Sequence, residues 1–237
     1  MIADSCVGMQ ACLNVGVSAT TDPVSDFNAK AFLSTVGPGR EMVSFRKGQS
    51  IYAQGDVSDA VFVIQTGIVR LSARSHGGKE ATLDILGSED LVGKDSMSGQ
   101  LTRTASANAL TNCQLLRIET KTMVRVLAKE VTLSNAFGAY VLRRNLRYQQ
   151  DLAEQRCDNS ERRLAGILLR MAHLDGHGSP DTTIPRISQN TLAELVGTTR
   201  SRVSHFMNRF KELGFIDYGG GNDGVQIRDS LLSFYGQ

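Results

Sequence analysis

The stretch that decides the fold of the carboxy-terminal part of the chain is residues 188–214, SQNTLAELVGTTRSRVSHFMNRFKELG. Its spacing is typical of a helix-turn-helix, in which two short helices are joined by a tight turn. Ala193 is small enough for two steeply crossing helices to meet, and Gly197 can take the left-handed conformation that ends the first helix. We therefore predict a shared core formed by Leu192, Val196, Val203 and Phe206.

The second predicted helix is cationic, because its only acidic residue, Glu212, is outnumbered by Arg200, Arg202, Arg209 and Lys211. Either of two adjacent threonines can cap its first turn. Such a helix fits the major groove of DNA, where arginine donates two hydrogen bonds to guanine. We predict double-stranded DNA as the partner, and as DNA-binding residues Thr198, Thr199, Arg200, Ser201, Arg202, Ser204, His205 and Arg209.

The flanking segments complete this domain. Residues 163–174 carry apolar side chains at helical spacing and predict a helix. Residues 215–218 and 225–227 enclose a glycine-rich turn and predict a hairpin, which would be the wing beside the helix-turn-helix. Residues 159–237 are thus predicted to form a winged helix-turn-helix domain.

A long helix is predicted immediately upstream, because residues 132–157 contain no proline and a single glycine, Gly138. At 1.5 Å per residue it would be roughly 37 Å long. Its apolar band is wider than packing on one domain requires. We predict that residues 131–158 form a dimerisation helix with the interface residues Leu133, Phe137, Tyr140, Val141, Leu142, Leu146 and Leu152. The alternative is a helix that packs only on its own domain.

Residues 37–130 hold short β-prone runs separated by turn-forming residues, several of them glycine. The predicted strands are residues 50–53, 61–64, 67–71, 81–86, 104–110 and 113–118. Many short strands at regular spacing predict a small antiparallel β-roll. Residues 1–36 are small, polar and aperiodic, and we expect a flexible extension with little fixed structure. The predicted fold class is therefore α+β: a β-roll, a long helix and a winged helix-turn-helix.

Composition excludes several classes of protein. The chain has 237 residues, 41% of them hydrophobic and 21% charged, as in an ordinary globular protein. No apolar run approaches the length of a membrane span, and no basic segment followed by an apolar block suggests a signal peptide. Four scattered cysteines make a poor disulfide framework. We expect a cytoplasmic protein without a membrane partner.

Five motifs carry a resemblance to a known family: IYAQGD at 51–56, VIQTGIVRL at 63–71, GKE at 78–80, RTA at 103–105 and GTTRSRVS at 197–204. With them, the chain resembles the Crp/Fnr superfamily of bacterial transcription regulators over roughly residues 37–234. The resemblance implies a cyclic-nucleotide-binding roll, a dimerisation helix and a winged helix-turn-helix. It also makes RNA polymerase a candidate partner.

The resemblance implies an effector site at Gly93, Lys94, Arg103 and Thr104. In members that bind cyclic AMP, a Gly-Glu pair accepts from the ribose, and an arginine with a hydroxyl residue holds the cyclic phosphate. Lys94 stands in place of the glutamate and cannot accept a hydrogen bond. We expect cyclic nucleotide binding to be weak, altered or absent, so no cofactor is assigned. The alternatives are a more anionic ligand, or a Lys94 that points into water while Arg103 pairs with a local carboxylate.

The recognition helix departs from the family as well. Similar proteins place Arg-Glu at its start and arginine further on, where this chain has Arg200-Ser201 and His205. Serine reads cytosine less selectively than glutamate does. The usual half-site of the family is therefore not expected.

Cysteine and histidine spacing predicts neither an iron–sulfur cluster nor a metal site. Cys6 and Cys12 are not tightly clustered, and Cys113 falls in a predicted strand. Cys157 is interpreted as a small buried residue. The histidines His76, His173 and His177 show no metal-ligand spacing.

Together these features predict a homodimeric, sequence-specific transcription regulator that is not an enzyme. Two recognition helices about 34 Å apart would bind an inverted-repeat operator. Two alternatives stay open: a cyclic-nucleotide-responsive regulator that tolerates Lys94, and a protein-interaction module that does not bind DNA.

Overall fold

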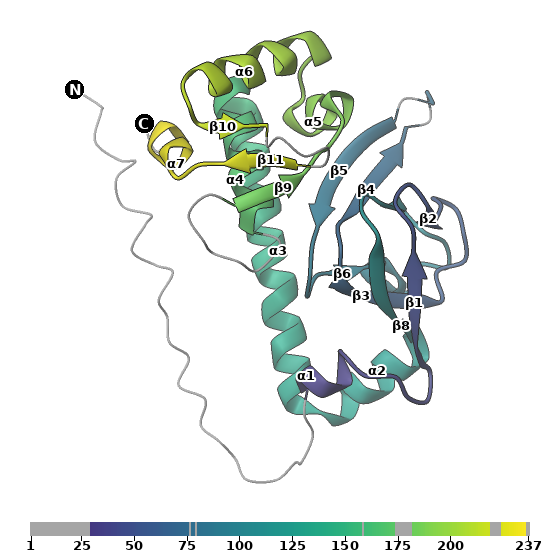
Figure 1. The fold of residues 1–237 in the computed structure, drawn as a ribbon. Coiled ribbons are helices and arrows are strands. Elements are labelled where there is room, and N and C mark those ends of the chain that lie inside the picture. The colour runs from purple at the N-terminus through teal and green to yellow at the C-terminus, as the bar shows by residue number, and fades with distance from the viewer. Residues whose placement is uncertain are drawn as a thin grey trace, which may run out of the picture.

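The computed structural model describes residues 29–75, 77–78, 80–157, 159–173, 182–218 and 224–235. In these residues the predicted α+β architecture is confirmed (Figure 1). A β-roll lies on one side of a long helix, α3 (Val131–Cys157), and a second domain lies at the far end of that helix.

The roll consists of two four-stranded antiparallel sheets with the orders β1-β8-β3-β6 and β2-β7-β4-β5. Its strands are β1 (Arg40–Phe45), β2 (Ser50–Tyr52), β3 (Ala60–Thr66), β4 (Val69–Arg74), β5 (Glu80–Leu86), β6 (Leu91–Val92), β7 (Ser106–Ala109) and β8 (Cys113–Glu119). Alternating apolar side chains of both sheets meet in one core, which includes Ile64, Leu86 and Leu115. Strands β1 and β6 are not among the predicted runs.

A second cluster packs the helices onto the outside of the roll. Helix α1 (Ala29–Phe32) and helix α2 (Thr120–Lys129) place Phe32 and Met123 beside Leu133 of α3. Phe32 is only 7% exposed, and the Arg40 guanidinium stacks on its ring at 4.5 Å. Residues 29–32 of the predicted extension are therefore ordered, whereas residues 1–28 of it lie outside the described part.

The long helix α3 has two distinct faces. One face packs on the roll of the same chain and carries Leu133, Phe137, Tyr140 and Arg144, which are spaced three or four residues apart. The opposite face exposes Leu142 and Leu146, whose side chains are 64% and 58% exposed. The apolar band is wide because two faces share it: one packs on the roll of the same chain, and the other is exposed.

The carboxy-terminal domain is a winged helix-turn-helix, as predicted. It comprises α4 (Ser160–His173), β9 (Thr182–Pro185), α5 (Gln189–Val196), α6 (Arg200–Glu212), β10 (Ile216–Asp217), β11 (Gly224–Ile227) and α7 (Ser230–Tyr235). The wing has the strand order β10-β11-β9, so a third strand, β9, joins the predicted hairpin. Leu192, Val196, Val203 and Phe206 are buried together in one core, which confirms the prediction.

Polar contacts join these parts. Arg144 of α3 donates to Asp84 of β5 at 2.5 Å, and both side chains are almost fully buried. The Thr82 hydroxyl donates to Glu194 of α5 at 2.5 Å and so joins the roll to the winged domain. In the described part of the chain, no helix is both long and apolar enough to cross a membrane.

Candidate DNA-binding face and effector cavity

The turn between α5 and α6 is built by caps at both helices. Ser188 caps α5 by accepting from the Thr191 amide at 3.0 Å, and Gly197 ends that helix with a φ of 70°. Thr199 caps α6 by accepting from the Arg202 amide at 3.4 Å. Of the two candidate threonines, Thr199 is therefore the cap, while the Thr198 amide donates to the carbonyl of Ala193.

The outward face of α6 carries small and polar side chains. Val203, Phe206, Met207 and Phe210 are buried on its inner side. At helical spacing the centre of the opposite side falls on Ser201, His205 and Asn208, all of them exposed. Asn208 was not predicted as a site residue, although its position seven residues after Ser201 is a signal for the same face.

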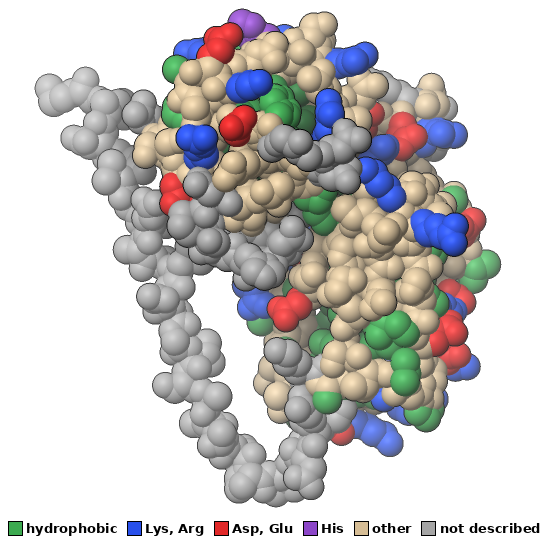
Figure 2. Space-filling model, viewed as in Figure 1, with side chains coloured by type: hydrophobic (Ala, Val, Ile, Leu, Met, Phe, Trp, Pro, Cys, Tyr) green, Lys and Arg blue, Asp and Glu red, His purple; other side chains and the backbone are tan. Residues whose placement is uncertain are grey.

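The predicted arginines lie on the flanks of this face. Arg200 is exposed on one side, together with Ser204, which is partly buried. Arg202 lies on the other side, with its guanidinium 5.9 Å from the Phe206 ring centroid. Arg209 shares that flank but donates to Glu161 of α4 at 3.0 Å, so it is already paired within the chain. Figure 2 shows separate Lys and Arg side chains over this domain rather than one continuous basic patch.

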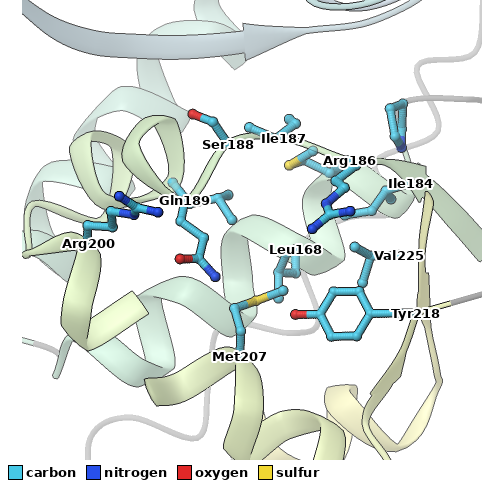
Figure 3. Close-up of a pocket in the computed structure, with 13 residues that line it drawn as sticks. Leu168, Ile184, Arg186, Ile187, Ser188, Gln189, Arg200, Met207, Tyr218 and Val225 are labelled. Carbon is cyan, nitrogen blue, oxygen red and sulfur yellow. The ribbon is translucent and has the colours of Figure 1, made fainter. Parts of the chain in front are cut away.

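A cavity of about 510 Å³ lies beside this face, between α4, α5, α6 and the wing. Figure 3 shows Gln189 and Tyr218 pointing into it from opposite sides, with Leu168 and Met207 between them. Arg186 and Arg200 also line it, and Figure 3 shows Arg200 beside Gln189, on the opposite side of the cavity from Val225 and Tyr218 of the wing. Burial raises the pKa of the Tyr218 hydroxyl above its ordinary value.

A second cavity, of about 670 Å³, lies between the roll and α3. Gly93, Lys94 and Thr104, three of the four predicted effector residues, line it, together with Asp95. Much of the remaining wall is apolar and is formed by Tyr52, Leu71, Leu83, Met97, Phe137 and Val141. The structure thus brings this predicted site together and places α3 against it.

Arg103, the fourth predicted residue, is held behind the cavity wall by its own chain. Its side chain is 1% exposed and donates to the carbonyls of Gly93 at 3.0 Å and Ala60 at 2.6 Å. It also donates to Asp95 at 3.2 Å and stacks on Tyr52 at 4.3 Å. Pairing of Arg103 with a local carboxylate, one of the two alternatives, is therefore what the structure contains.

Lys94 does not point freely into water, contrary to the other half of that alternative. Its ammonium group donates to the hydroxyl of Tyr148 on α3 at 3.4 Å and lies 5.7 Å from the ring centroid. Lys94 therefore links the roll directly to the long helix across the mouth of the cavity.

The predicted interface residues divide between the two faces of α3. Leu133 is 1% exposed and is buried against its own roll, so it is unavailable to a second chain, contrary to the prediction. Phe137 and Tyr140 pack against the same cluster. Val141, Leu142, Leu146 and Leu152 stay exposed.

Buried polar groups fix α3 to the roll. The Tyr140 hydroxyl accepts from the Leu91 amide at 3.0 Å and donates to Asp90 at 3.3 Å. Burial, with the charge of Asp90 as the second cause, raises the pKa of Tyr140. Burial lowers the pKa of Arg144, but Asp84 and Asp90 outweigh it and raise that pKa overall, so Arg144 stays charged.

The cysteine and histidine predictions are only partly covered. Cys113 lies in β8 as predicted, and burial raises the pKa of its thiol. Within the described residues no group of His, Cys, Asp and Glu side chains has the arrangement of a metal site. Cys6, Cys12, His76 and His177 lie outside those residues.

Comparison with known proteins agrees with this architecture. The cyclic nucleotide-binding domain model matches residues 42–130, and the Crp-like helix-turn-helix domain model matches residues 162–230. The Cyclic AMP receptor protein of Thermus thermophilus is 28% identical over 188 residues, covering 79% of this chain and 84% of the relative. The CRP-like cAMP-activated global transcriptional regulator of Mycobacterium tuberculosis is 27% identical over 190 residues, with the same coverage.

Among solved structures, FixK2 from Bradyrhizobium japonicum has the same fold, with a TM-score of 0.68 at 18% identity over 82% of this chain and 96% of that one. A winged helix-turn-helix joined to a roll of this type defines a DNA-binding transcription regulator. The chain belongs to the Crp/Fnr superfamily.

Proposed function

We propose that this protein is a cytoplasmic homodimer that binds an inverted-repeat operator, is not an enzyme, and reads each half-site with α6. The observation that carries this proposal is the outward face of α6, where Ser201, His205 and Asn208 stand between flanking arginines. Asparagine pairs with adenine edges and arginine with guanine edges in the major groove. Because the face lacks a glutamate at its start, the half-site should differ from those read by Arg-Glu helices.

The exposed face of α3 supports dimerisation. Leu142 and Leu146 are 64% and 58% exposed, and they lie on the side of the helix opposite the face that packs on the roll. Leu152 is 50% exposed, but it lies toward β5 of the roll. Gly138 shares the side of Leu142 and Leu146, and apart from the adjacent turns of α3 itself no atom of the described residues lies within 4 Å of the position that a Cβ would take there. A second α3 can therefore approach closely, which would set the two α6 helices one turn of DNA apart.

Genome-wide mapping of bound sites tests the proposal, followed by footprinting of the purified full chain on the recovered sequences. The expected result is a protected inverted repeat with half-site centres about 34 Å apart. Affinity for random duplex should fall as salt rises, because phosphate contacts release counterions. A flat salt dependence with no enriched sequence would favour the protein-interaction alternative instead.

RNA polymerase is the protein partner that we propose, since a regulator bound beside a promoter acts on that enzyme. Transcription in vitro from a mapped promoter, with and without this protein, tests it.

The effector is a separate question: the names of two relatives refer to cyclic AMP. Lys94 and Asp95 argue against cyclic AMP as the effector of this chain.

A further inference from the structure

We propose that the Asp95 carboxylate is a built-in substitute for a phosphate in the effector cavity, so that the cavity rejects cyclic nucleotides and accepts phosphate-free ligands. The proposal goes beyond the DNA-binding function and concerns the roll alone. It does not depend on which operator the protein reads.

The contacts of Asp95 are those that a bound phosphate would make. Its Oδ2 atom accepts from the Thr104 amide at 2.9 Å and from the Thr104 hydroxyl at 3.2 Å. Its Oδ1 atom accepts from Arg103 at 3.2 Å. An arginine, a hydroxyl and a backbone amide that converge on two anionic oxygens form an anion site, and here the anion belongs to the chain.

Arg103 cannot easily leave this arrangement for a ligand. Its other terminal nitrogen donates to the Ala60 carbonyl at 2.6 Å, and its guanidinium is stacked on the Tyr52 ring. A Cβ on residue 93 would lie 2.4 Å from the guanidinium, so a glycine with a φ of 74° is required at Gly93. The arginine therefore serves Asp95 as a fixed partner.

A phosphate that entered the cavity would meet a carboxylate where it needs donors. The Asp95 side chain is 18% exposed, so water screens it only in part. The negative charges of Asp95 and of the phosphate would repel each other. The amide and hydroxyl of Thr104 already donate to Asp95. Wild-type protein should therefore not bind the cyclic phosphate, although the fold around the site is retained.

The rest of the cavity indicates what it can take. Leu71, Leu83, Met97, Phe137 and Val141 supply apolar walls in a volume of about 670 Å³. A largely apolar ligand without a phosphate would bury against these walls and leave the pair of Asp95 and Arg103 intact. Because Phe137 and Val141 belong to α3, such a ligand would contact the helix directly.

Calorimetric titration and thermal unfolding of the full chain with cyclic AMP, cyclic GMP and inorganic phosphate test the proposal. Wild type should show neither heat of binding nor a rise in Tm. Asp95→Ser, which removes the charge and opens space, should gain affinity for cyclic AMP of about tenfold or more and should be stabilised by inorganic phosphate. Glu41→Gln, which removes an exposed charge elsewhere on the roll, is the matched control and should behave as wild type.

Asp95→Asn provides a second variant of the same shape, in case Asp95→Ser folds poorly once Arg103 has lost the carboxylate of Asp95. A variant that unfolds at low temperature but recovers with inorganic phosphate or cyclic AMP supports the proposal. Cyclic AMP binding to wild type overturns it, and so does a failure of both variants to gain anion binding. Operator binding, measured in the same preparations, keeps this outcome separate from the DNA-binding proposal.

Discussion

The Thr82 hydroxyl donates to a carboxylate oxygen of Glu194 at 2.5 Å, so that the first helix of the helix-turn-helix is tied to a strand of the sensor roll. Thr82 is 6% exposed, and Arg70 of the neighbouring strand stands 3.7 Å from the same carboxylate. This polar contact is one of those that hold the winged domain against the rest of the chain.

Removing either partner of this contact should loosen the winged domain. Thr82→Val and Glu194→Gln are each expected to cost about 1–2 kcal/mol of unfolding free energy. The double variant should cost less than the sum, because both changes remove one interaction. Denaturant unfolding of the four proteins measures the coupling, and strictly additive values would show that the contact is not formed in solution.

Arg202 and Arg209 should differ in their importance for DNA although they share a flank of α6. Arg202→Ala should weaken specific binding by about 1–3 kcal/mol if the side chain contacts a base edge. Arg209→Ala should cost less, because Arg209 is already paired with Glu161. Fluorescence anisotropy on operator and random duplex separates the two effects. An equal loss of affinity on both duplexes would assign Arg202 to the phosphate backbone.

The two faces of α3 should respond to mutation in opposite ways. Leu142→Glu combined with Leu146→Glu should convert a dimer to a monomer with little change in fold stability, since both side chains are exposed. Leu133→Ala should instead keep the dimer and lose about 2–5 kcal/mol of unfolding free energy, because it leaves a cavity in the roll cluster. Analytical ultracentrifugation and thermal unfolding distinguish these outcomes. A double variant that stays dimeric would place the interface elsewhere.

The buried pair of Arg144 and Asp84 should be costly to break from one side. Arg144→Met leaves two carboxylates without their cation and is expected to cost about 3–5 kcal/mol. The exposed neighbour Arg143→Met is the matched control and should change stability by less than about 0.5 kcal/mol. Adding Asp84→Leu to Arg144→Met should recover part of the loss in denaturant unfolding. Equal stabilities of the two single arginine variants would contradict the assigned role of Arg144.

Local patterns were sufficient to predict helix α6 and most strands of the roll, but not β1, β6 or the wing strand β9. Glycine corners, apolar spacing and adjacent caps are each encoded within a few residues, so the roll strands and α6 could be located from them. Asn208 was not predicted because it carries no charge, although its spacing from Ser201 places it on the outward face.

Long-range pairing could not be predicted in the same way. Nothing near Asp95 in the sequence indicates that its carboxylate meets Arg103 and Thr104 across a turn. The pairing of Arg209 with Glu161 joins residues 48 positions apart, and that of Thr82 with Glu194 joins residues 112 apart. The two faces of α3 could be separated only once the roll that covers one of them was known.

Helix α3 is long compared with the movements that a ligand can cause at its base. Its 27 residues make a rod of roughly 40 Å, and a tilt of about 5° at the roll end displaces the far end by about 3.5 Å. That displacement is close to the rise of one nucleotide step, about 3.4 Å. In the proposed dimer, a slight reorientation at Phe137 would thus shift each recognition helix by about one base pair along its half-site.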